Sequence, residues 1–286
     1  MRDDSLFSIG EVARQTGVNP VTLRAWQRRY GLVVPQRTAK GHRLYTEQDV
    51  AQIRQILAWL ELGVSIGQVP QLLQQPQAET PAATAANGAH WDSWIARLDE
   101  AVIQLASRRL EAVLGELLAS YPLDLLRRQV LTPWVARWPA LRERADGEAL
   151  LAYISHWAEA YFARRLIEQE KGRPLVLAGW GNLPPLTLAL DGLTAIQAGY
   201  QVLCLPNLDP AQARLLAPRW QGPLLVVPGA GLSAAERGQA WPPQTVFIGE
   251  LSALYAPESP AHASASWPAM AAWLSAQEAD DAAGLV

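Results

Sequence analysis

The residues of this sequence with the plainest chemistry are the cationic side chains that gather between Arg24 and Arg43. This stretch holds most of the positive charge of residues 1–75, a segment that is net positive although the whole chain has a formal charge of -3. Guanidinium groups bind phosphate oxygens and the edge of guanine through paired hydrogen bonds. Because phosphate contacts depend on nearby charge and not on the total, the pattern is typical of a nucleic-acid-binding module.

Two short helices joined by a tight turn are expected to position these cations. The capping box Ser8–Glu11 starts the first helix, and Gly17 ends it. Asn19 then stands as an N-cap before Pro20 at the first helical position, so a second helix is predicted to run to about Tyr30. A helix pair of this kind is the helix-turn-helix arrangement.

The second helix and the segments after it complete the predicted module. Val21 and Leu23 are expected on the inner face of the second helix. The segment Pro35–Tyr45 is predicted to form a basic hairpin that lies against a phosphate backbone, with turn chemistry at Lys40–Gly41. A third helix is predicted within Thr46–Gly63, opened by a cap at its first residue.

Four segments of this module resemble the MerR family of transcription regulators. They are Ile9–Ala13, Thr22–Leu32, Pro35–Arg37 and Gly41–Tyr45, and the likeness covers residues 6 to about 73. The Arg-Ala-Trp-Gln-Arg-Arg-Tyr variant in the second segment is most similar to the MlrA and CarH/LitR branch of the family. Members of that branch carry a helical bundle and a cobalamin-binding-type α/β domain after a linker.

The resemblance implies a sequence-specific regulator that binds double-stranded promoter DNA as a dimer or higher oligomer. Two second helices would enter successive major grooves, the hairpins would act as wings, the promoter spacer would be distorted, and RNA polymerase would be a partner at target promoters. The DNA-binding positions carried over are Thr22, Arg24, Trp26, Arg28, Arg29, Tyr30, Arg37, Lys40, His42, Arg43 and Tyr45. Which arginines meet guanine and which meet phosphate stays open. The alternatives are a solvated helix face for the arginines, a core position for Trp26 and a plain surface position for His42.

The chain of 286 residues is long enough for two or three domains. After the module of residues 1–75, residues 76–90 contain no aliphatic side chain larger than Ala and are interpreted as a flexible linker. Apolar residues at helical spacing predict a four-helix bundle over residues 91–171. Beyond it, short apolar runs alternate with helical stretches, which predicts a doubly wound, flavodoxin-like α/β domain over residues 172–286. The expected strands are Pro174–Ala178, Tyr200–Leu205, Pro223–Val227 and Thr245–Ile248.

A second hypothesis makes this last domain a receptor for cobalamin, a nucleotide or another small molecule, in a crevice near Trp180, Asn182 and Gly229. The run Gly229–Ala234 mimics a dinucleotide fingerprint, but it follows the third strand and not the first. The cobalamin-binding relatives place a histidine ligand after the first α/β strand, where this chain has Gly179–Asn182. Because asparagine has no imidazole nitrogen to meet cobalt, we expect no cobalamin and no other cofactor.

An α/β enzyme fused to a regulator is a third hypothesis, and it lacks a nucleophile or an acid–base pair that would support it. We therefore expect no enzymatic activity, and we interpret His156 and Glu159 as a polar pair and not as a metal site. The single cysteine, Cys204, excludes an internal disulfide. No apolar run reaches the ~18 residues of a membrane span and no secretory signal opens the chain, so we expect a cytoplasmic protein without membrane contact.

Overall fold

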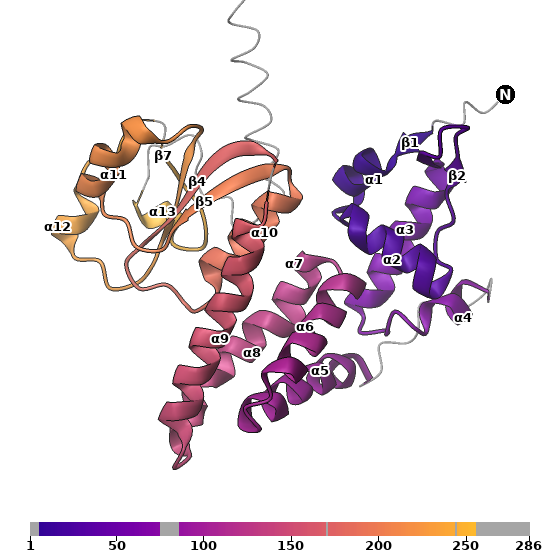
Figure 1. Ribbon diagram of the computed structural model, residues 1–286, viewed down its shortest axis with the longest axis horizontal. Coiled ribbons are helices and arrows are strands. Elements are labelled where there is room, and N and C mark those ends of the chain that lie inside the picture. Colours follow the sequence, from indigo (N-terminus) through magenta and orange to yellow (C-terminus); the bar gives the residue numbers. More distant parts are fainter. Residues whose placement is uncertain (1–5, 75–85, 170, 244, 256–286) are drawn as a thin grey trace, which may run out of the picture. The chain divides into compact units, whose positions relative to one another are not determined.

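The computed structural model describes residues 6–74, 86–169, 171–243 and 245–255 (Figure 1). The chain falls into two compact units, Met1–Ile154 and Ser155–Val286. Residues 76–85 of the expected linker and residues 256–286 of the expected α/β domain lie outside the described residues. No helix in the described part of the chain is both long and apolar enough to cross a membrane.

The amino-terminal module, residues 6–74, combines a small antiparallel sheet with short helices. Its strands are β1 (Phe7–Ser8), β2 (Gln36–Arg37) and β3 (Arg43–Tyr45), and its helices are α1 (Ile9–Thr16), α2 (Pro20–Tyr30), α3 (Glu47–Glu61) and α4 (Val69–Leu73). Strand β3 lies between β1 and β2 and is antiparallel to both. The structure therefore contains the expected helix pair and hairpin, with β1 added at the edge of the hairpin.

The residues expected to cap these helices do so. Asn19 Oδ1 accepts a hydrogen bond from the backbone N–H of Thr22 at 2.8 Å, at the start of α2. Gly17 and Gly31 end α1 and α2 with φ angles of 71° and 66°. This left-handed conformation costs most other residues about 1–2 kcal/mol. A full capping box at Thr46–Asp49 opens α3, which fixes the direction in which the chain leaves the hairpin.

Only half of the capping box expected at Ser8–Glu11 forms. Ser8 Oγ accepts from the backbone N–H of Glu11 at 3.2 Å, but the Glu11 carboxylate binds Arg14 and Gln15 and does not reach back. The hydrogen bond from Arg14 is also the largest effect that lowers the pKa of Glu11. The backbone of Ser8 belongs to β1, where it is paired with Leu44 of β3.

A group of helices over residues 86–154, called the bundle here, makes up the rest of the first unit. It contains α5 (Ala86–Ile103), α6 (Ser107–Ser120), α7 (Leu123–Leu126), a π-helical segment (Arg127–Leu131), α8 (Thr132–Arg137), a 3-10 turn (Trp138–Glu143) and the first part of α9 (Gly147–Ile167). Leu98, Leu110, Leu114 and Leu126 are fully buried at its centre. Pro122, Pro139 and Gly147 lie where one helical segment of the bundle gives way to the next.

The bundle begins earlier than expected. Residues 86–90 are part of the expected linker, yet α5 begins at Ala86. Small residues cannot form a core by themselves, but alanine has the highest intrinsic helix propensity. The helix that starts there continues into the buried side chains of Trp91 and Trp94, which anchor it.

The second unit contains a parallel sheet with helices between its strands. Following α9, its elements are β4 (Arg173–Trp180), α10 (Thr187–Gln197), β5 (Tyr200–Leu205), α11 (Pro210–Leu216), β6 (Leu224–Pro228), α12 (Ala234–Arg237), β7 (Thr245–Phe247) and α13 (Ser252–Tyr255). The strands are parallel and lie in the order β5-β4-β6-β7. Each expected strand is present with its ends shifted by no more than two residues.

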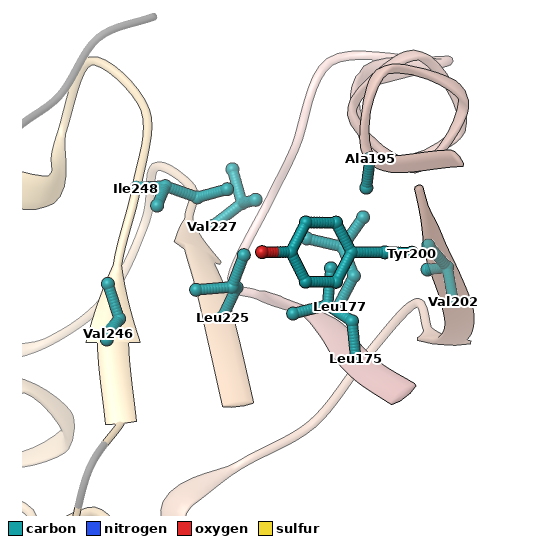
Figure 2. Packing of buried hydrophobic residues seen from close by; sticks show 9 residues of the cluster. All are labelled: Leu175, Leu177, Ala195, Tyr200, Val202, Leu225, Val227, Val246 and Ile248. Carbon is teal, nitrogen blue, oxygen red and sulfur yellow. The ribbon is translucent and has the colours of Figure 1, made fainter. Parts of the chain in front are cut away.

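Both faces of this sheet are buried along its two central strands, β4 and β6. On one face, the side chains of Leu175, Leu177, Tyr200 and Leu225 pack together with Ala195 of α10 (Figure 2). On the other face a separate cluster contains the alternate residues of the same strands: Val176, Ala178, Trp180, Leu224, Val226 and Phe247, with Ala213 of α11. Alternation across two covered faces explains why the strands are continuously apolar in the sequence.

Candidate nucleic-acid interface

One face of α2 is exposed and carries cations. Val21, Arg24 and Arg28 are spaced three and four residues apart, so they share a helical face, and all three are exposed. The side chain of Val21 is 62% exposed, which corrects the expectation that it packs inward, whereas Leu23 is buried as predicted. Arg29 is exposed as well and lies in the last turn, where a positive charge interacts favourably with the helix dipole.

Three residues expected to contact DNA are interior side chains. Thr22 and Trp26 have no exposed surface, and Tyr45 is 1% exposed. Because an enclosed side chain cannot touch a base or a phosphate in this conformation, we reassign these three to structural positions. Burial also raises the pKa of the Tyr45 hydroxyl, against the opposing effect of Arg43 and Arg24. For Trp26, the alternative of a core position holds.

The hairpin is built around a tight turn. The backbone N–H of Thr38 donates to His42 O at 2.9 Å, and that of Gly41 donates to Thr38 O at 2.8 Å. Gly41 has a φ of 81°, the left-handed conformation that the Lys40–Gly41 pair predicts. This turn leaves the side chains of Arg37, Lys40 and His42 exposed.

Arg43 connects the hairpin to α2. Its Nε donates to Gln27 Oε1 at 3.2 Å, and the side chain is half-buried. A hydrogen bond between the two elements limits how far they can move relative to each other. Sequence analysis missed Gln27, since a glutamine inside a run of arginines has no signature of its own.

The sequence-predicted residues that remain at the surface form one set, called the cationic surface here. Its members are Arg24, Arg28, Arg29, Tyr30, Arg37, Lys40, His42 and Arg43, of which Tyr30 and Arg43 are half-buried. Among the described residues, none of its arginines or its lysine makes an ion pair like the one between Arg14 and Glu11. Their positive charge is therefore not neutralised by a carboxylate of the same module.

Comparisons with known proteins agree with this geometry. Residues 7–76 match the family described as MerR HTH family regulatory protein. The HTH-type transcriptional regulator MlrA of Escherichia coli (strain K12) is 32% identical over 241 residues, which cover 82% of this chain and 93% of that protein. MlrA of Salmonella typhimurium (strain LT2) is 34% identical over 207 residues, or 69% and 79% of the two chains. The HTH-type transcriptional repressor CarH of Myxococcus xanthus is 30% identical over 175 residues, or 59% and 58%.

The chain belongs to the MerR family of transcriptional regulators. Within the family it is MlrA-like, as the likeness to MlrA extends well beyond the residues of the amino-terminal module. The proteins with which this MerR-family regulator shares its sequence are named as transcriptional regulators, and none of the names denotes an enzyme.

At the expected crevice of this regulator, the two segments that carry Asn182 and Gly229 are joined by backbone hydrogen bonds. Asn182 and Ala230 exchange two backbone hydrogen bonds of 2.9 Å, where the chain leaves β4 and β6. A Cβ atom at Gly229 would lie 2.4 Å from Asn182 O, and one at Gly231 would lie 2.9 Å from Asn182 Nδ2. The two glycines therefore make room for Asn182, which accounts for the fingerprint-like run without a bound phosphate.

The residues at this edge do not fit cobalamin. Trp180 is 4% exposed and packs against the rings of Trp241 and Phe247, at centroid distances of 5.2 Å and 6.5 Å. The sequence holds no histidine between residues 171 and 255 that could meet cobalt. Within the described residues there is also no cluster of three or more histidine, cysteine or acidic side chains that could hold a metal ion.

Proposed function

We propose that this regulator binds a specific promoter sequence as a dimer or higher oligomer, with α2 of each copy in the major groove. The observation that carries the proposal is the cationic surface, where arginines on α2 and on the hairpin are exposed and have no carboxylate partner in the described module. An α-helix fits the major groove of B-DNA, and arginine forms paired hydrogen bonds with guanine. The hairpin would contact the flanking phosphates as a wing.

The finer fold assignment is part of the same proposal. The helix pair with the β2–β3 hairpin supports a winged helix-turn-helix, and the helices that follow support a four-helix bundle. In the sheet order β5-β4-β6-β7, the first strand of the unit lies between the second and the third. That order is the one of flavodoxin-like doubly wound domains. We infer that this domain serves as an oligomerisation surface or as a sensor, and not as an enzyme.

The remaining partners follow from the regulatory role. A protein of this kind acts by changing how RNA polymerase uses a promoter, so RNA polymerase is the expected partner at the bound site, and the cytoplasm is the expected place of action. Two copies with twofold symmetry would match a pseudo-palindromic operator with half-sites one helical turn apart. The crevice hypothesis receives no comparable support, because Asn182 occupies the space beside Gly229.

The test is the affinity of the full chain for duplex DNA from the region upstream of its own gene, with footprinting to locate the site. Arg24→Ala and Arg28→Ala each remove a cation from the exposed face of α2. Loss of a base contact should weaken binding by about 1–3 kcal/mol. Loss of a phosphate contact should reduce the slope of log affinity against log salt concentration by about one.

The matched control is Arg108→Ala, which removes an exposed arginine from the bundle helix α6. It changes the net charge by the same amount but should leave the affinity and the footprint unchanged. Equal effects of all three substitutions would contradict the assignment of the contacts to α2.

A further inference from the structure

The covered face of α2 meets the bundle through Trp26. The indole Nε1–H of Trp26 donates to the backbone O of Ser120 at 2.7 Å, inside the first unit. Ser120 is the last residue of α6, and carbonyl groups in the last turn of a helix have no partner within that helix. The indole therefore supplies a hydrogen bond that the end of α6 needs, at a place where neither residue is exposed to water.

A second contact lies at the end of α3. Arg128 donates to both carboxylate oxygens of Glu61, at 3.1 Å and 2.6 Å, and Asp124 holds the same guanidinium from within the bundle. The hydrogen bond with Glu61 is the largest effect that raises the pKa of Arg128. A paired contact of this geometry fixes orientation as well as distance.

A third contact lies between α3 and α4. The backbone N–H of Ile66 donates to Tyr121 Oη in a long hydrogen bond of 3.5 Å, and Tyr121 Oη also lies 3.0 Å from His90 Nε2. Tyr121 is 2% exposed, and burial raises its pKa to about 12. Three separate points of the amino-terminal module thus meet Ser120, Tyr121 and Arg128, which together are called the docking patch.

The docking patch leaves the cationic face of α2 open. The residues on the covered face, Thr22, Ala25 and Trp26, are buried, whereas Arg24 and Arg28 on the other face are exposed. The bundle therefore holds the helix from the side away from Arg24 and Arg28. A contact that buried the arginines would block DNA, but this one is compatible with DNA binding.

We propose that the docking patch positions α2 for DNA reading, so that the bundle sets the affinity of the module for its operator. This inference rests on the proposed function, because it assigns a positioning role to residues that do not touch DNA. Three contacts at separate points of the module restrict its rotation against the bundle. A helix held in one orientation loses less freedom when it enters the groove. Loosening the patch should weaken operator binding without removing any DNA contact.

The test changes only bundle residues, because Trp26→Phe could unfold the module itself. A double variant, Tyr121→Phe with Arg128→Met, removes the Ile66 and Glu61 contacts. The control is Arg142→Met, which removes an exposed bundle arginine whose partner, Glu148 at 2.9 Å, belongs to the bundle. The probes are a duplex that the wild-type full chain selects from a random pool and a shuffled duplex of the same length.

We expect the double variant to bind the selected duplex at least about fivefold more weakly, the lower end of typical coupling between sites. Its affinity for the shuffled duplex should change by less than about twofold, since the phosphate contacts remain. Hydrogen exchange at the backbone amides of residues 21–30 should be faster in the free double variant and unchanged in the control. These results together would support the positioning role.

Unchanged or tighter binding of the selected duplex by a folded double variant would overturn the inference, and tighter binding would mark the contact as inhibitory. A wild-type chain that prefers no duplex over any other would instead contradict the proposed function, and the inference would fall with it. Unchanged hydrogen exchange of α2 in the double variant would also overturn the inference, whatever the affinity.

Discussion

Trp26 has a role that its neighbours in sequence do not indicate. It lies among arginines on a helix expected to read DNA, yet its indole N–H donates to a carbonyl 94 residues away. A large aromatic side chain within a basic helix has two interpretations, a groove contact or a core position, and local sequence does not separate them. The contact that decides between them comes from α6, which no pattern within α2 could predict.

His90, which lies beside Tyr121 of the docking patch, predicts that the stability of the fold depends on pH. Its Nε2 accepts from Trp94 Nε1–H at 3.3 Å and lies 3.0 Å from Tyr121 Oη, and burial lowers its pKa. A histidine with a lowered pKa in the folded state stabilises the fold fully above its unfolded-state pKa of 6.5. This stability is lost as the pH falls below that value, because the unfolded chain then binds the proton more readily.

The measurement is the urea midpoint of unfolding at pH 7.5 and pH 5.5. We expect the urea midpoint of the wild type to be lower at pH 5.5 than at pH 7.5. The decrease should be smaller in His90→Gln, because glutamine keeps a hydrogen-bond acceptor but does not titrate. His156→Gln serves as the control, since His156 is exposed. The same fall in wild type and His90→Gln would rule out His90 as its source.

At the scale of elements, the sequence predicts most of what local signals control. The strand Tyr200–Leu205 has the bounds expected from its apolar run, and the caps at Asn19 and Thr46 form as expected. The failures occur where another residue competes for the same group or where packing between elements selects a different helix face. The Ser8 box is incomplete because Glu11 has Arg14 as a partner, and Val21 is exposed because α2 packs on a different face.

The predicted end of the linker differs from the structure for another reason. Composition identifies a stretch without large apolar residues, but it does not say whether alanine-rich residues next to a helix join it. Residues 86–90 join α5 since the buried Trp91 and Trp94 follow at once. In the same way, Gly229 is correctly predicted at the end of a strand, but only the fold brings Asn182 against it.

Replacing glycine by alanine should have opposite effects on stability at two positions of the bundle. Gly115 lies within α6 and a Cβ there would meet nothing within 4 Å, so Gly115→Ala should stabilise the protein by about 0.8–1 kcal/mol. Gly147 starts α9, and a Cβ there would lie 1.8 Å from Leu141 O. Gly147→Ala should therefore destabilise the protein by about 1–3 kcal/mol, because the backbone must shift.

Both effects are measured as free energies of unfolding in urea, monitored by circular dichroism at 222 nm, where the helices contribute most of the signal. The two substitutions add the same methyl group, so each is the control for the other. Destabilisation by Gly115→Ala would mean that α6 packs more tightly at this point than its open surroundings indicate.

At the scale of the whole molecule, charge is divided unevenly. The chain has a net charge of -3, so a general attraction to phosphate is not expected. In the proposed function, the contact with DNA comes from the cationic surface of the amino-terminal module, whose arginines and lysine have no carboxylate partner among the described residues. The rest of the chain would then act through oligomer formation and through the contacts that hold α2.

This division gives the salt dependence of operator binding a defined origin. Each phosphate contact releases about 0.9 ion from B-DNA, so a dimer with several contacts per copy should show a log–log slope steeper than about -4. Arg37→Ala, on the exposed hairpin, should make the slope shallower by about one ion per copy. Arg108→Ala on α6 should leave it unchanged.

The most direct test is therefore a salt titration of the affinity of the full chain for the duplex that it selects. The account predicts a steep decrease in affinity with salt, a shallower slope in Arg37→Ala, and a clear preference for the selected duplex over a shuffled one. A chain that remains folded but binds no duplex, even in dilute buffer, would contradict it.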